Sequence, residues 1–423
     1  MNSTAARITE KNLFENGRIF IAPTNARDVV TVAGSVFGGP NMLPRLLTGV
    51  PLLAGGLFDA GTKAHTKDVL REALASRGAT LSFSSGGGSD RTSFSGSCLP
   101  EDLTFLLKTI VECLHEASFP QKEILLERAQ ILGRIQESAT ETRTQATNEL
   151  WRILYDERHV NYVEKDADVK RYVSNVTRKQ LIDFRSMLGK GGLVLAIAGD
   201  TDSSIALKAV ERSFAILNRG TLTASVKTAN GKKGVGQERK VAIANKANID
   251  VFLGASVPLT RDDDLFLPFV VLSDMLGGGF AGHLMQTVRE RDGLTYGIST
   301  APSGFAKDVT GAFRIWSTFS PDLFEKGLEA IQKEVRTFFS KGLTEDALRS
   351  KKEEILGSYV IGLSTTHGLA NALHSIGVEE KPLSRIDEYP NLIRAVTVGE
   401  LQRVADLIPY TQLSIAAAGT FAK

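Results

Sequence analysis

The sequence has only two cysteines, Cys98 and Cys113, and almost no net charge. Two thiols are too few for a disulfide framework or a four-thiolate zinc site, and they fit a reducing compartment best. A formal charge of +2 gives no general field that would attract nucleic acid or an anionic membrane. We therefore expect no nucleic-acid partner.

Long apolar runs are also missing, and we expect no leader segment. No run of residues is apolar over the length that a bilayer requires. The first residues lack an apolar core, and Glu10 and Glu15 argue against an Arg-rich transit peptide. These absences predict a cytoplasmic protein without a membrane partner.

What is present is a normal globular composition in two halves. A chain of 423 residues, 42% of them hydrophobic, suits two domains of about 200 residues each. Both halves alternate strand-like segments rich in β-branched residues with helical segments that carry an apolar stripe. The segment 218–238 is polar, rich in glycine and without a period, which indicates a linker. We predict an N-terminal domain over 1–217 and a C-terminal domain over 239–423.

The second half repeats the first. Three pairs of segments match in order, two at an offset of 220 and one at 224: Val176–Leu181 with Val396–Leu401, Leu195–Gly199 with Ile415–Gly419, and Ile131-Leu-Gly with Ile355-Leu-Gly. Each match is weak alone, but together they favour two similar α+β domains in tandem.

One long string in the second half resembles a known family. It reads Leu276-Gly-Gly-Gly-Phe-Ala-Gly-His-Leu-Met-Gln-Thr-Val-Arg-Glu-Arg-Asp-Gly-Leu-Thr-Tyr-Gly-Ile298. This is similar to the pitrilysin family of zinc peptidases, in its processing-peptidase branch, where a glycine-rich turn precedes a helix ending in Arg-Glu and then Gly-Leu-x-Tyr. The resemblance extends over nearly the whole chain. It implies a half-shell of two domains, each a mainly antiparallel β-sheet packed with helices.

The resemblance places Arg289 and Tyr296 on the family's Arg/Tyr pair. An arginine can fix a substrate carbonyl or carboxylate, and a phenol can donate to a developing oxyanion. The turn of Gly277, Gly278 and Gly279 permits positive φ and a close approach of peptide backbone, so we expect it to bind substrate. From spacing alone, the alternative is that Arg289 pairs with a nearby acid and Tyr296 packs on its strand.

The zinc motif of the family is missing. Active members carry His-x-x-Glu-His, whose histidines bind zinc and whose glutamate activates water. Here the matching segment is Leu52-Leu-Ala-Gly-Gly56, so Leu52 and Gly56 replace the ligands and Gly55 replaces the base. The third ligand falls at Arg134, or at Gly133 if the match slips by one. We predict that this chain holds no metal and no cofactor.

The resemblance therefore implies a partner. In the family, the zinc motif and the Arg/Tyr pair come from different half-shells, on one chain or on two. We expect a non-catalytic subunit of a heterodimeric zinc metallopeptidase, inactive alone, that supplies Arg289 and Tyr296 in trans. The partner would be a homologous active subunit with an intact His-x-x-Glu-His and bound zinc.

Family members hold peptide substrates by strand addition at a sheet edge. The matching edge here is Leu81–Ser85, with Ser82, Phe83 and Ser84 as candidate contacts, although this strand also suits a purely structural edge. Two other functions remain open: a structural subunit like those at the core of a respiratory complex, and a peptide-binding homodimer without a role in proteolysis. Unrelated enzyme chemistry is disfavoured, because no nucleophile and base stand at a recognisable spacing.

Overall fold

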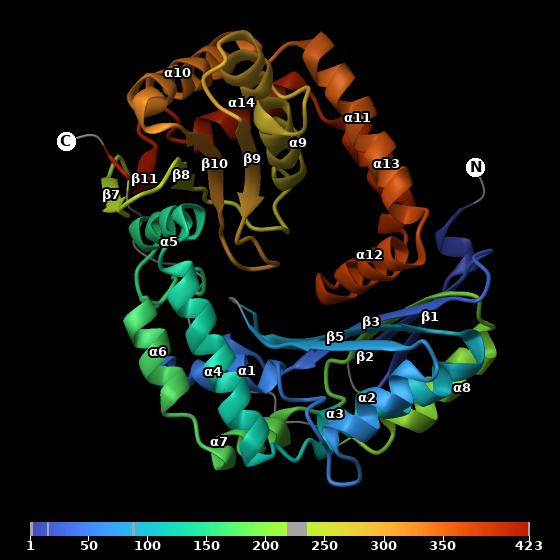
Figure 1. Ribbon diagram of the computed structural model, residues 1–423. Coiled ribbons are helices and arrows are strands. Elements are labelled where there is room, and N and C mark those ends of the chain that lie inside the picture. The colour runs from blue at the N-terminus through green and yellow to red at the C-terminus, as the bar shows by residue number, and fades with distance from the viewer. Residues whose placement is uncertain (1–2, 15–16, 87–88, 218–234, 422–423) are drawn as a thin grey trace. The chain divides into compact units, whose positions relative to one another are not determined.

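The computed structural model describes residues 3–14, 17–86, 89–217 and 235–421 (Figure 1). The chain forms two compact units of three segments each. The first unit comprises Met1–Arg134, Lys165–Val226 and Ser358–Tyr389, and the second comprises Ile135–Glu164, Lys227–Gly357 and Pro390–Lys423. These units interleave along the chain, whereas the predicted ranges 1–217 and 239–423 divide the sequence repeats. Residues 218–234 of the predicted linker lie outside the described residues.

The first unit contains a six-stranded mixed sheet. Its strand order is β1 (Thr9–Leu13), β2 (Gly17–Pro23), β6 (Val194–Gly199), β3 (Val30–Phe37), β5 (Arg91–Cys98) and β4 (Thr80–Ser84). The β2–β6 pair is parallel and the other four pairs are antiparallel. Every residue of β6 is buried, as expected for a central strand with helices on both faces. Strand β4 forms one edge.

Helices cover both faces of this sheet. On one face, α12 (Thr366–Val378) packs Leu369, Leu373 and Ile376 against Phe20 and its neighbours. On the other face lie α3 (Leu103–Glu116) and α8 (Ser203–Phe214), visible below the strands in Figure 1. The unit also contains α1 (Gly49–Gly55), α2 (Lys67–Ala75), α6 (Asp166–Ser174) and α7 (Arg178–Met187). Three helices contribute residues to both units, namely α4 (Gln121–Ser138), α11 (Glu345–Leu363) and α13 (Arg385–Ala395).

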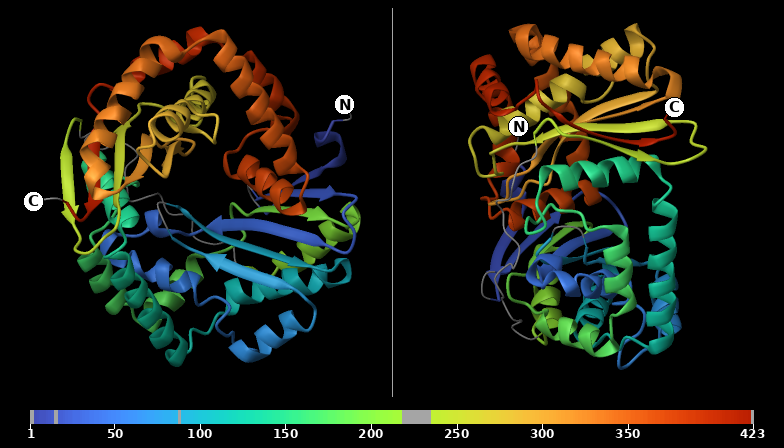
Figure 2. Two further views of the ribbon diagram at one scale, coloured as in Figure 1. Left: turned by 45° about the horizontal axis from the view of Figure 1, so that its top comes forward. Right: turned by 90° about the vertical axis from the view of Figure 1, so that its left-hand side faces the viewer.

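The second unit contains a five-stranded mixed sheet. Its strand order is β7 (Glu238–Ala242), β11 (Ser414–Gly419), β8 (Ile249–Ser256), β10 (Ala312–Phe319) and β9 (Gly297–Ser303). The β7–β11 pair, seen side by side in Figure 2, is parallel, and the other pairs are antiparallel. One face packs on α5 (Thr142–Leu154). The unit also has α9 (Phe266–Gly277), α10 (Phe324–Thr337) and α14 (Val398–Leu407).

The two units confirm the internal repeat. In each sheet the last strand of the repeat, β6 or β11, lies between one parallel and one antiparallel neighbour. The helix before it begins with a capping box in both cases, Thr177 with Gln180 in α7 and Thr397 with Glu400 in α14. The fold is thus α+β with two helix-packed, mainly antiparallel sheets, as predicted.

The helices α5 and α12 correspond in the repeat, since Thr142 and Thr366 differ by the same 224 residues as the Ile-Leu-Gly matches. Helix α12 packs on the sheet that contains β2, and α5 packs on the sheet that contains β8. Each unit therefore has a helix from the other repeat over one face of its sheet. Among the described residues, no helix has both the length and the apolar character needed to cross a membrane.

Candidate functional site

The predicted glycine turn follows α9. Gly277 ends the helix, and a Cβ atom there would lie 2.9 Å from the backbone nitrogen of Thr300 on β9. A Cβ atom on Gly278 would lie 1.8 Å from a carboxylate oxygen of Asp274, and Gly279 has φ of +62°. The glycines therefore permit a close approach within the chain itself. Their contact with a peptide stays a prediction.

A buried lysine supports this turn, and sequence reasoning missed it. Lys351 on α11 is 4% exposed, and its Nζ donates to the Gly278 carbonyl at 3.1 Å. The ammonium also pairs with Glu354 at 2.8 Å and with Asp274 at 3.5 Å. Burial raises the pKa of the Asp274 carboxyl, and Lys351 opposes that shift. In the sequence, Lys351 and Glu354 look like an ordinary surface pair three residues apart, so nothing marked the lysine as buried.

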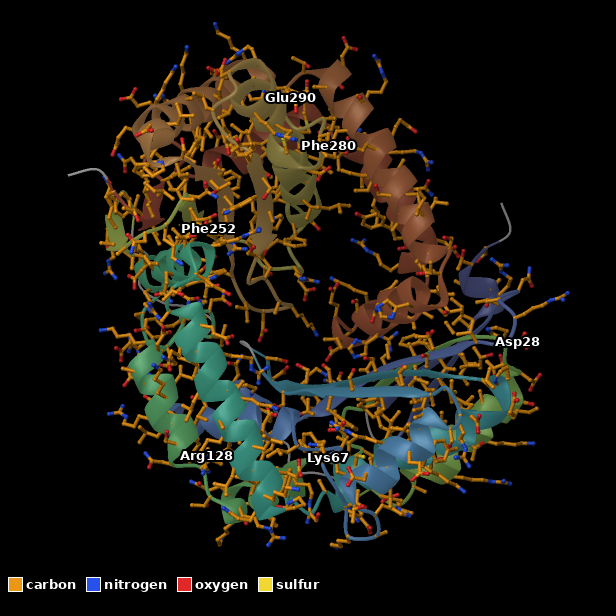
Figure 3. The ribbon with its side chains drawn as sticks, viewed as in Figure 1. Asp28, Lys67, Arg128, Phe252, Phe280 and Glu290 are labelled. Atoms are coloured by element: carbon orange, nitrogen blue, oxygen red, sulfur yellow. The ribbon has the colours of Figure 1, made fainter. Side chains whose placement is uncertain are left out.

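Arg289 lies in the last turn of a helical segment, Met285–Arg291, whose hydrogen bonding is that of a π-helix. Its Nη1 donates to the sulfur of Met285 at 3.4 Å and lies 3.5 Å from a carboxylate oxygen of Glu290. Its guanidinium lies 5.6 Å from the ring centre of Phe280. Figure 3 labels Phe280 and Glu290 close together in this part of the unit. A π-helical turn shifts side chains around the helix axis, and such turns are frequent at functional sites.

Tyr296 immediately precedes β9, and its side chain is 85% exposed. Its neighbours fix the backbone: the hydroxyl of buried Thr295 donates to the Thr318 carbonyl at 2.5 Å and accepts from the Gly297 amide at 3.1 Å. The alternative role of strand packing is therefore wrong for Tyr296. The phenol has no hydrogen-bond partner among the described residues, so it is held at a fixed backbone position and open to a ligand.

In the first unit, β4 is an edge strand, as the peptide-binding prediction requires. Ser82 and Ser84 are exposed, whereas Phe83 is half-buried against Phe58 and Phe94 with ring centres 5.5 and 6.5 Å away. A cleft of about 250 Å³ lies between this edge and α12, and Ser82, Phe83, Ser84 and His374 are among its lining residues. The three predicted contacts therefore share one cleft, while peptide binding there stays a prediction.

A buried polar network lies under this cleft. The Nε of Arg91 donates to the Ser35 hydroxyl at 2.7 Å, and that hydroxyl lies 2.8 Å from Nε2 of His374. Because the Ser35 oxygen accepts the hydrogen bond from Arg91, we assign the Ser35 hydroxyl proton to a hydrogen bond that it donates to Nε2 of His374. Burial, followed by the charge of Arg91, lowers the pKa of His374 to about 4. The imidazole is therefore neutral at physiological pH.

The degenerate zinc segment forms α1 and its C-terminal end. A Cβ atom on Gly55 would lie 2.9 Å from the backbone nitrogen of Ser85, and one on Gly56 would lie 2.4 Å from Oε1 of Glu127. Leu52 is half-buried and has no donor atom. Arg134 is largely exposed and donates to Glu127 at 3.1 Å. Glu127, which the sequence did not single out, is thus the acid beside Gly56, the position that the resemblance assigns to the second histidine.

These residues do not fit a zinc ion. Leucine and glycine offer no side-chain ligand at the positions where the family needs two imidazoles, and the nearby carboxylate already pairs with a guanidinium. Throughout the described ranges, no three His, Cys, Asp or Glu side chains gather closely enough to hold a metal.

A family model matches the later part of the chain. Residues 175–355 match the family model described as the peptidase M16 inactive domain. This part of the chain is similar to the M16 peptidases. This finding confirms the resemblance to pitrilysin-type peptidases drawn from the Gly-Gly-Gly to Gly-Leu-x-Tyr string.

The curated proteins similar to this chain include several named as zinc proteases and one named as a non-peptidase homolog. It is 27% identical over 218 residues to an uncharacterized zinc protease of Streptomyces coelicolor, covering 50% of this chain and 47% of the relative. It is 23% identical over 231 residues to the non-peptidase homolog YmxG of Helicobacter pylori, covering 54% and 52%. The alignments thus span about half the length of these curated relatives.

A solved structure shares the fold across nearly the whole chain. The peptidase M16 inactive domain from Pseudomonas fluorescens superposes with a TM-score of 0.88 and 19% identity, covering 98% of both chains. The α+β architecture with two helix-packed sheets is therefore an architecture already seen in this family.

Proposed function

We propose that this protein is the non-catalytic subunit of a heterodimeric zinc metallopeptidase in the cytoplasm. Arg289 and Tyr296 would act in trans on a peptide bound at the zinc site of a homologous partner with an intact His-x-x-Glu-His. The observation that carries this proposal is the 85% exposure of Tyr296 on a backbone fixed by Thr295. An exposed aromatic residue with an unpaired hydroxyl is suited to an interface with a partner or ligand.

The chemistry follows from the two groups. The phenol of Tyr296 donates its proton in a hydrogen bond to the oxygen of the scissile carbonyl as negative charge develops there. Arg289 holds a neighbouring carbonyl or carboxylate of the peptide, since its contacts to Met285 and Glu290 leave further N–H groups available. Exposed Phe280 supports the guanidinium from one side. The zinc site of the partner would supply the activated water.

The test is a reconstituted complex with the active homologue. Tyr296→Phe should lower peptide turnover by roughly a hundredfold to a thousandfold while the subunits still assemble. Tyr410→Phe, which removes a phenol hydroxyl elsewhere in the second unit, is the control and should leave turnover unchanged.

Three outcomes would contradict the proposal. Turnover could be insensitive to Tyr296→Phe in an assembled complex. The purified chain could form only homodimers or a structural assembly without a peptidase partner. Stoichiometric zinc together with proteolysis by the chain alone would also overturn it.

A further inference from the structure

A second cleft lies in the second unit, on the sheet face that α5 covers, near Phe252 in Figure 3. Its volume is about 420 Å³. Its polar lining is basic and hydroxylic, and the residues used below are Arg143, Thr144 and Thr147 from α5 and Ser299, Arg314 and Trp316 from the sheet. It occupies the same place in this unit as the cleft between β4 and α12 in the first unit, because β9 corresponds to β4 and α5 to α12.

Arg143 stacks on the indole of Trp316, with Cζ 3.8 Å from the ring centre. The indole is itself held, because its N–H donates to Asp250 at 2.7 Å. Stacking uses one face of the guanidinium and leaves its in-plane N–H groups free to donate. The guanidinium of Arg143 is therefore held in place by the indole, and its N–H groups can donate two hydrogen bonds to one carboxylate.

Arg314 lies deeper, over Trp151 and Phe252. Its Nη1 donates to the Thr147 hydroxyl at 3.0 Å, while its Nε is buried without any hydrogen-bond partner. Burial lowers the pKa of the Arg314 guanidinium, and the charge of Arg143 adds to that effect. A buried donor with no acceptor is costly and calls for an explanation.

Neither arginine has a carboxylate partner among the described residues. The acids nearby are engaged otherwise: Asp250 accepts from Trp316 and from Thr142 at 2.5 Å, and Glu141 accepts from Thr144 at 3.0 Å. Two cations that repel each other beside aromatic rings and hydroxyl groups are stabilised when an oxyanion binds between them.

We propose that this cleft binds the carboxylate of an extended acidic peptide. Ser299 lies on β9, an edge strand whose outer backbone groups can pair with an added strand. Alternate side chains of such a strand would then face Arg143 and Arg314. The choice of a peptide as the source of the carboxylate rests on the proposed function. The anion site itself rests only on the arrangement of Arg143 and Arg314 in the cleft.

The experiment uses the full chain without a partner and measures fluorescence anisotropy. The probes are a fluorescein-labelled peptide with glutamate at alternate positions and the same peptide with glutamine instead. We expect the glutamate peptide to bind roughly tenfold tighter or more, and added salt to weaken it. Arg143→Met and Arg314→Met should each remove about tenfold of its affinity. The control is Arg336→Met, which removes the same positive charge from an exposed position on α10.

Equal binding of the two peptides, or full affinity in Arg143→Met, would overturn the assignment. Arg143 is exposed, so its replacement tests the cleft without disturbing the core. If inorganic phosphate binds in the cleft and the glutamate peptide does not, the cleft is an anion site but the proposal that its ligand is a peptide is wrong. This binding is measured without a partner subunit, whereas the turnover test needs one, so a failure here is distinct from a failure of the proposed catalytic role.

Discussion

Arg134 donates an N–H to the Glu127 carboxylate over 3.1 Å, two turns along the same helix. Residues seven apart lie on one face of a helix, and this face of α4 meets Gly56 at the end of α1. At the segment that the resemblance assigns to the zinc motif, this chain therefore has a carboxylate neutralised by a guanidinium of the same helix. The pair is partly exposed, so its contribution to stability is small.

Gly55 should be intolerant of any side chain, although it lies in a helix. Alanine usually stabilises a helix relative to glycine, but a methyl group here meets the Ser85 backbone nitrogen at 2.9 Å. We expect Gly55→Ala to lower the free energy of unfolding by about 1–3 kcal/mol in urea titrations. Gly133→Ala in α4 is the control, since nothing lies within 4 Å of its Cβ position, and it should gain about 0.5–1 kcal/mol. Equal gains at both positions would show that α1 does not approach Ser85 this closely.

His374 should make the first unit less stable as the pH falls. Its pKa is about 4 in the folded chain against about 6.5 when unfolded, so the unfolded state takes up a proton first. The neutral imidazole thus contributes full stability above pH 6.5, and that stability is lost progressively between pH 6.5 and 4. We expect a loss of about 2 kcal/mol between pH 7 and 5 from this group.

The measurement is urea unfolding at several pH values. His374→Gln keeps an acceptor for Ser35 without a titrating group, so its stability should change less between pH 7 and 5 than that of the unsubstituted chain. His367→Gln, on the exposed part of the same helix, should retain the original pH dependence. Identical curves for the His374→Gln variant and the unsubstituted chain would contradict the assignment.

Lys351 should stabilise the glycine turn. Lys351→Met would leave the Asp274 carboxylate without its cation and the Gly278 carbonyl without its donor. Because Asp274 is still 35% exposed, we expect a loss of about 2 kcal/mol and not the larger loss typical of a fully buried pair. Thermal unfolding would measure it, with exposed Lys341→Met as the control. Equal melting temperatures for the two variants would rule out this role.

Much of the fold could be predicted because the signals are local. Thr177 and Thr397 with their partners three residues on mark the starts of equivalent helices, and apolar runs mark β6 and β11. The position of β4 at a sheet edge was also predicted. The π-helical turn at Arg289 was not, because its sequence has the apolar spacing of an ordinary helix.

The sequence by itself determined that two similar α+β halves exist and that imidazole and carboxylate groups are missing from the zinc segment, because covalent order fixes which side chains are present. Only the tertiary structure decided that Glu127 meets Gly56, that Lys351 is buried behind Gly278, and that Arg143 and Arg314 share a cleft. Those relationships depend on packing between segments far apart in the chain, where burial and the lack of a counter-charge change what a side chain does.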